Sequence, residues 1–233
     1  MNWIDNLASL FRWSKEDNAI EKQSPIEEQI LVKKPAPVNK QISIDFNLRM
    51  LIIADTHGCL YEDEIPFDHT ADVCLLLGDL SLQDIAIIQE HIDDIPIYGV
   101  LGNHDDLDLY DLCGIENIHG KVVEVKGVRV AGIQGSLRYK YSDMPLYTDE
   151  ESVEIAEAMG AADILISHDS PKYLHGTNDF AHSGLQGITR YCEKYSVPLN
   201  IHGHHHENMK SVLPNGTTSI CCHKVQIMDT KNL

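Results

Sequence analysis

The sequence has few basic residues and no long apolar run. Its 233 residues include 18 Lys and Arg against 36 Asp and Glu, which gives a formal net charge of −18. Such a charge repels long nucleic acids and anionic membrane surfaces unless a local feature reverses the field. No stretch approaches the roughly 20 apolar residues of a membrane-spanning helix, and the first residues show no secretory signal pattern. We therefore expect a cytoplasmic protein that binds no long nucleic acid.

The six cysteines are not spaced as in a metal-binding or redox motif. No CxxC pair occurs, and a disulfide between the adjacent Cys221 and Cys222 would be strained. We expect buried, reduced thiols, with a redox role for Cys221 and Cys222 as the alternative. With 43% hydrophobic and 23% charged residues, the chain can form the core of one domain without disulfides.

Residues 1–46 differ from the rest of the chain. Trp3, Leu7 and Leu10 recur at helical spacing and predict a short amphipathic helix, whereas residues 14–47 hold prolines and charges typical of an extended linker. This helix is expected to pack on its own domain or on a twin subunit, and the alternatives are a partner protein or a membrane surface. Residues 47–233 are predicted to form the catalytic domain.

A regular pattern of apolar segments begins at Leu48. Continuous apolar runs predict buried parallel strands at 48–54, 72–77 and 97–101, and a helix at 82–92 lies between the last two. The second half predicts a hairpin at 122–125 and 128–133, helices at 149–159 and 184–195, strands at 164–166 and 199–201, and an antiparallel meander at 209–213, 217–221 and 225–228. We expect an α/β fold, a four-layer α-β-β-α sandwich of two mixed sheets flanked by helices.

Five short motifs rich in metal ligands each follow an expected strand. They are Asp55-Thr56-His57, Gly78-Asp79, Gly102-Asn103-His104-Asp105, His168 and Gly203-His204-His205-His206. Side chains at the carboxyl ends of strands meet in one crevice, and mixed carboxylate and imidazole ligands suit Mn, Fe and Zn. One such residue alone is more often a helix cap or a loop residue, but five in this order indicate a two-metal site.

The order of these motifs resembles that of the calcineurin-like metallophosphoesterase superfamily, over about residues 48–206. The resemblance implies two divalent ions, with manganese favoured over iron and zinc, that share Asp79. One ion would be bound by Asp55, His57, Asp79 and His206, and the other by Asp79, Asn103, His168 and His204. It also implies a phosphoesterase in which a hydroxide between the ions attacks phosphorus in line. His104 would protonate the leaving oxygen or stabilise the transition state, and His205 would face away from the ions.

Four further residues are candidates for supporting roles. Asp105 is a candidate to orient His104 or the neighbouring ligands, with a simple loop role as the alternative. Arg138 is a candidate phosphate clamp, with a surface cation that balances nearby acids as the alternative. His175 and His182, in the loop 174–184, are predicted to line the mouth of the pocket, and solvated loop histidines are the alternative.

The substrate is expected to be a small phosphorylated molecule or nucleotide, as a diester or a monoester. In Ser/Thr protein phosphatases the motif that ends here in Asp105 usually ends in Glu, and their additional arginine motifs are missing. A protein phosphatase is therefore the weaker alternative. The other alternative is a scaffold that keeps the fold without catalysis, but such scaffolds typically lose ligands or the residue equivalent to His104.

Overall fold

A computed structural model describes residues 40–66, 70–92, 94–175 and 179–233, which include every predicted site residue. The predicted N-terminal helix and most of the linker lie outside the described residues, so the boundary at residue 46 stays a prediction. Residues 40–46 are extended. The Ile42 N–H donates to the Gly216 carbonyl at 2.9 Å, and Ile44 and Phe46 pack against the core. No helix in the described ranges is long and apolar enough to cross a membrane.

The first sheet has five strands in the order β13-β1-β2-β3-β4. Its members are β1 (Arg49–Ala54), β2 (Val73–Leu76), β3 (Ile97–Gly99), β4 (Glu116–Asn117) and β13 (Lys224–Asp229). The first four are parallel, and β13 runs antiparallel to β1. The three predicted N-terminal strands are thus confirmed. Strands β1 and β2 are almost wholly buried, as their continuous apolar sequences require.

The second sheet has six strands in the order β11-β12-β10-β9-β6-β5. Its members are β5 (Val122–Val125), β6 (Val128–Ile133), β9 (Ile164–Ser167), β10 (Leu199–His202), β11 (Met209–Val212) and β12 (Thr218–Cys221). Four central strands are parallel, and β5 and β11 are antiparallel edges. A separate pair, β7 (Ser136–Leu137) and β8 (Leu146–Tyr147), lies beside this sheet.

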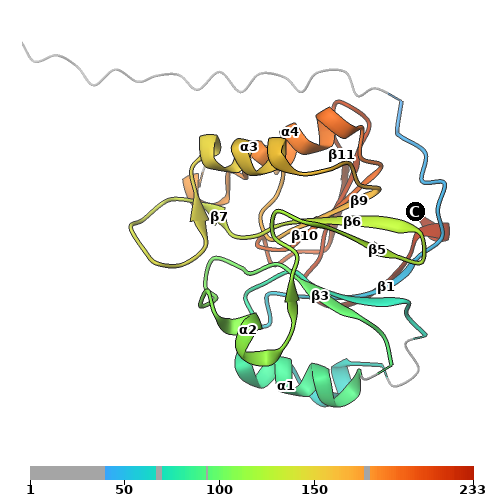
Figure 1. Ribbon diagram of the computed structural model, residues 1–233, viewed down its shortest axis with the longest axis vertical. Helices are drawn as coiled ribbons and strands as arrows, with labels where there is room; N and C mark the ends of the chain where they lie inside the picture. Colours follow the sequence, from blue (N-terminus) through green and yellow to red (C-terminus); the bar gives the residue numbers. More distant parts are fainter. Residues whose placement is uncertain (1–39, 67–69, 93, 176–178) are drawn as a thin grey trace, which may run out of the picture. The chain divides into compact units, whose positions relative to one another are not determined.

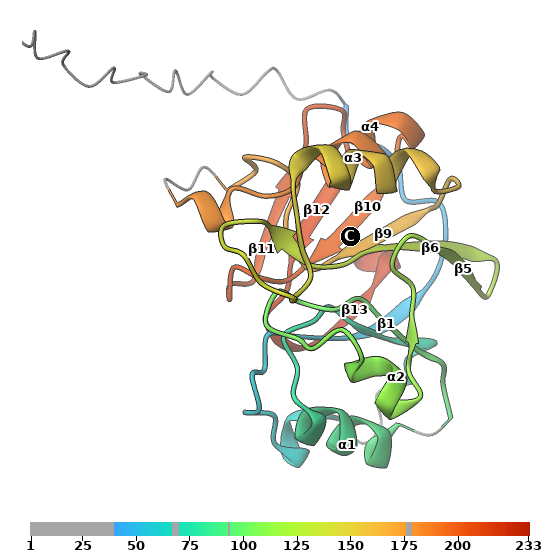
Figure 2. The same cartoon turned by 60° about the vertical axis from the view of Figure 1, so that its left-hand side comes forward.

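The helices lie on the outer faces of the two sheets, so the predicted four-layer sandwich is confirmed (Figure 1). The helices α1 (Leu82–His91) and α2 (Leu109–Cys113) cover the first sheet, and α3 (Asp149–Ala158) and α4 (Gln186–Tyr195) cover the second. Three short 3-10 helices complete the described elements: η1 (Glu62–Glu64), η2 (Phe180–His182) and η3 (Thr230–Asn232). The central core fills the space between the sheets (Figure 2).

The predicted C-terminal meander is wrong in its last strand. Strands β11 and β12 do pair antiparallel, but β13 leaves that sheet and pairs with β1 over its whole length. The described part between β1 and β2 holds only η1. The error at β13 concerns a strand pairing that local sequence signals do not specify.

Candidate metal centre

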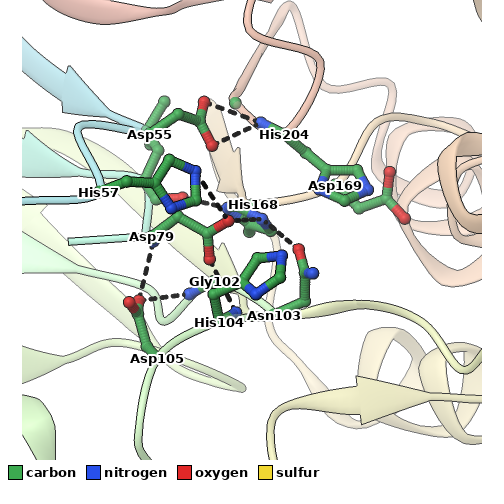
Figure 3. A network of polar contacts seen from close by, with 12 residues as sticks. Asp55, His57, Asp79, Gly102, Asn103, His104, Asp105, His168, Asp169 and His204 are labelled. Carbon is green, nitrogen blue, oxygen red and sulfur yellow. Dashed lines mark hydrogen bonds and ion pairs between the residues drawn. The ribbon is translucent and has the colours of Figure 1, made fainter. Parts of the chain in front are cut away.

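All seven predicted metal ligands lie at the carboxyl ends of strands from both sheets, and Figure 3 labels all of them except His206. Asp55 and His57 follow β1, Asp79 follows β2, and Asn103 lies beyond β3. His168 follows β9, and His204 and His206 follow β10, in the second sheet. The site is therefore built across the two sheets of the sandwich.

The first group of ligands is open to solvent. Asp55, His57 and His206 each present a ligand atom within 4.8 Å of the others. The His57 and His206 Nε2 atoms are 3.2 Å apart, and His206 Nε2 lies 4.0 Å from Asp55 Oδ1. Asp55 is buried, whereas the two histidines are exposed. A cation between these atoms would be reached from solvent.

The second group is buried and consists of Asp79, His168 and His204. His168 Nδ1 donates to the Leu77 carbonyl at 2.7 Å, so a neutral ring presents the lone pair of Nε2. His168 Nε2 lies 2.8 Å from Asn103 Oδ1. The amide is oriented this way because its other atom, Nδ2, faces Tyr139 Oη at 3.4 Å, so Oδ1 is the acceptor. Two acceptors this close repel each other unless the ring is protonated or one cation binds both. The donor set thus fits a metal ion.

Asp79 belongs to the second group and adjoins the first. Its Oδ2 atom lies 3.6 Å from His57 Nε2 in the first group and 3.6 Å from His168 Nε2 in the second. Burial and the neighbouring Asp79 carboxylate raise the pKa of Asp55 to about 8. Burial alone would also raise the pKa of Asp79. The His168 ring and the hydrogen bond from the His104 N–H outweigh burial, so the pKa of Asp79 is lowered. Divalent cations would remove the repulsion between two buried carboxylates.

The backbone of most ligands is in the left-handed region. Half of the non-glycine residues with positive φ in the described ranges are predicted ligands, namely Asp55 (55°), His57 (48°), Asp79 (55°), His204 (72°) and His206 (53°). Each such conformation is unfavourable for an L-residue, and clusters of them occur where function requires the geometry. Sequence analysis did not predict this feature.

Three glycines let the ligand loops approach each other closely. Gly78 has φ +90°, a conformation that glycine adopts easily and that turns the backbone sharply beside Asp79. Gly102 has another function, because a Cβ there would clash with the Asp79 side chain and backbone. Gly203 packs against Asp55 in the same way. These glycines are needed for contact between loops.

Asp105 connects two of the loops. Its Oδ2 accepts hydrogen bonds from the Asp79 and Gly102 N–H groups at 2.9 and 2.7 Å, and its Oδ1 accepts one from Leu80 at 2.9 Å. These bonds match the predicted positioning of neighbouring ligands rather than of the His104 ring. Burial raises the pKa of Asp105 to about 7, while its three N–H donors favour the charged form.

His104 lies at the exposed side of the centre. Its N–H donates to Asp79 Oδ1 at 2.9 Å, and its ring is 5.6 Å from that of His57. The side chain is exposed and stands beside the ligands without belonging to either group. His205 instead faces Ser170 Oγ at 3.2 Å and the His175 ring at 4.2 Å. The two histidines thus have different surroundings, and their predicted roles stay predictions.

Arg138 does not point at the centre as a phosphate clamp would. Its guanidinium donates to Glu151 at 2.7 Å and to the Leu146 carbonyl at 3.0 Å, so the alternative interpretation as a cation paired with a nearby acid describes it better. His182 does lie at the centre, because its ring stacks on His204 at 4.7 Å. His175 lies 3.3 Å from His202 and away from both ligand groups.

Three residues near the centre were missed by sequence analysis. Asp84 accepts hydrogen bonds from Thr56 Oγ1 and from the Gly58 and Leu60 N–H groups, at 2.7 to 3.0 Å, and so holds the loop after β1. Asp169 accepts from the Leu137 and Ser170 N–H groups. Tyr139 contacts Asn103. For Asp84 a local sequence signal exists, because Ser81 and Asp84 form the capping box of α1.

The six cysteines form no disulfide. Cys221 and Cys222 are both buried, and burial raises the pKa of Cys221 to about 12. A thiol of this kind stays protonated and unreactive. The pair therefore matches the expectation of buried, reduced thiols.

Comparisons with known proteins agree with this geometry. A Thermus thermophilus crystal structure matches with a TM-score of 0.57 at 13% identity and covers 79% of this chain and 100% of its own. The phosphopantetheinyl hydrolase of Mycobacterium tuberculosis matches with a TM-score of 0.50 at 11% identity, over 76% of this chain and 89% of its own. The chain therefore shares its fold with these two structures.

Sequence comparison finds a relative of higher identity than these structures. A Haemophilus influenzae protein described as uncharacterized is 29% identical, over 68% of this chain and 84% of its own length. No family model matches the chain. The assignment of the fold therefore depends on structure and on the arrangement of the ligands.

Proposed function

We propose that this chain is a metal-dependent hydrolase of small phosphoesters that binds two divalent ions. The observation that carries the proposal is the position of Asp79, whose Oδ2 is equally distant from one histidine of each ligand group. A carboxylate in that position is suited to bridge two cations. The fold shared with a phosphopantetheinyl hydrolase supports the reaction class.

The residues present fit specific roles. Asp55, His57 and His206 would hold one ion with Asp79, and Asn103, His168 and His204 would hold the other with it. Two ions in such sites neutralise phosphate oxygens and supply an activated water. We expect manganese to bind at both positions, because the ligands combine imidazole nitrogen with carboxylate and amide oxygen.

His104 is the residue proposed to act on the leaving group. It is exposed beside the open first group, and its backbone is fixed by Asp79. An imidazole titrates near neutral pH and can deliver a proton to an alkoxide. The position outside both ligand groups leaves its ring nitrogens available for this purpose.

The test is turnover of bis-p-nitrophenyl phosphate and p-nitrophenyl phosphate by manganese-loaded protein. We expect hydrolysis of at least one compound, its loss on chelation and its recovery when manganese is restored. Asp79→Asn should abolish both metal binding and turnover, whereas Asp111→Asn, at an exposed carboxylate on α2, should change neither. Metal-loaded protein that hydrolyses neither compound would instead favour a scaffold.

A further inference from the structure

Aromatic side chains from two separate segments lie beside the second ligand group. Tyr139 follows β7, and Phe180 and His182 belong to η2. These two segments pack against each other although they are about 40 residues apart in the chain. Phe180 is 63% exposed and Tyr139 is 37% exposed, so both residues have surface that a ligand could contact.

Each segment is joined directly to a predicted ligand. Tyr139 Oη lies 3.4 Å from Asn103 Nδ2. On the other side, the Ala181 carbonyl lies 3.2 Å from His204 Nε2, and the His182 ring stacks on the His204 ring. Asn103 and His204 both adjoin His168. The aromatic residues therefore stand on two sides of one ion position.

The His182 ring and the backbone of η2 are held in place by hydrogen bonds. Asp179 caps η2 by accepting a hydrogen bond from the Ala181 N–H at 3.1 Å, and it also binds His182 Nδ1 at 2.5 Å. The Ser183 hydroxyl donates to the Phe180 carbonyl at 2.9 Å. A ring fixed by its surroundings loses little conformational entropy when a ligand stacks on it.

We propose that the loop after β7 and η2 form a subsite for a planar aromatic group attached to the phosphate, the base of a nucleotide. This inference rests on the proposed phosphoesterase function and names its substrate class. Exposed aromatic rings can stack on any of the nucleobases, because every base has a planar π face. The Lys140 ammonium, 5.2 Å from the Tyr139 ring, adds positive charge at the same edge for an anionic substrate.

Binding of AMP and of ribose 5-phosphate to manganese-loaded protein tests the subsite. Both compounds carry the same phosphate and sugar, and they differ in the base. Titration calorimetry with His104→Ala protein avoids consumption of the ligand. We expect AMP to bind at least about fivefold more tightly than ribose 5-phosphate. Equal affinity for the two compounds, or binding of neither, would overturn the inference.

Substitutions show whether the preference comes from these rings. Tyr139→Ala and Phe180→Ala should each bring the affinity for AMP towards that for ribose 5-phosphate, which itself should not change. Tyr141→Ala is the matched control, because this tyrosine lies on the same loop and is fully exposed. A preference for AMP that survives both substitutions would contradict the assignment.

Turnover of bis-p-nitrophenyl phosphate by the wild-type protein separates the two proposals. Hydrolysis without a preference for AMP would support the phosphoesterase function and contradict the proposed subsite. A preference for AMP without any hydrolysis would leave a nucleotide-binding site and remove the enzyme.

Discussion

Most of the predicted metal ligands are held in unfavourable backbone conformations. Asp55, His57, Asp79, His204 and His206 all have positive φ, which costs an ordinary residue about 1 kcal/mol or more. The residue types and their order along the chain indicated the centre, because metal ligands form a small chemical set. The backbone conformation was not predictable, because it is imposed by contacts such as that of Gly102 with Asp79.

His104→Ala should separate catalysis from metal binding. His104 is outside both ligand groups, so the variant should keep its metal while its turnover of bis-p-nitrophenyl phosphate falls by about 10²- to 10⁴-fold. His206→Ala is the comparison and should lose metal at the first group. Elemental analysis of both proteins, with rates, is the measurement. An equal loss of metal in the two variants would show that His104 is itself a ligand.

Asp105→Asn should weaken the centre although Asp105 touches no ion position. The carboxylate accepts three backbone N–H groups with both oxygens, and an amide nitrogen cannot accept any of them. We expect a loss of about 1–3 kcal/mol in the free energy of unfolding and weaker manganese binding. Urea denaturation and metal titration measure the two effects. Asp106→Asn, next to it and exposed, should behave as wild type.

At the scale of elements, local signals predicted local structure well. The hairpin at Lys126 and Gly127 has its predicted strand bounds, and Thr148 caps α3 by accepting from the Glu151 N–H. The partner of β13 was wrong, because β1 lies about 175 residues away in the chain and no local pattern specifies that pairing. The short elements α2, β4, β7 and β8 were missed, since two to five residues carry little periodicity.

Contact between the loops after β2 and β3 depends on Gly102. In Gly102→Ala the new Cβ would clash with Asp79, so the two loops must separate and the shared ligand must move. We expect a large loss of manganese affinity by titration calorimetry. Gly160→Ala is the control, because a Cβ there meets Val122 at an ordinary 3.9 Å. Unchanged metal affinity in Gly102→Ala would show that the close approach of the loops is not needed.

At the scale of the whole molecule, both sheets supply residues to one site. The first sheet supplies Asp55, His57, Asp79 and Asn103, and the second supplies the remaining three histidines. The backbone N–H of His204 bonds to Asp55, so the sheets are tied together at the centre itself. A positive pair of ions in a chain of net charge −18 would concentrate small anions there and still repel long polyanions.

The most direct test of the central claim is an anomalous difference map from crystals grown with manganese. We predict two peaks for each chain, one on either side of Asp79 and about 3.5–4 Å apart. One peak should contact Asp55, His57 and His206, and the other Asn103, His168 and His204. An empty pocket, or peaks that do not share Asp79, would contradict the two-metal centre.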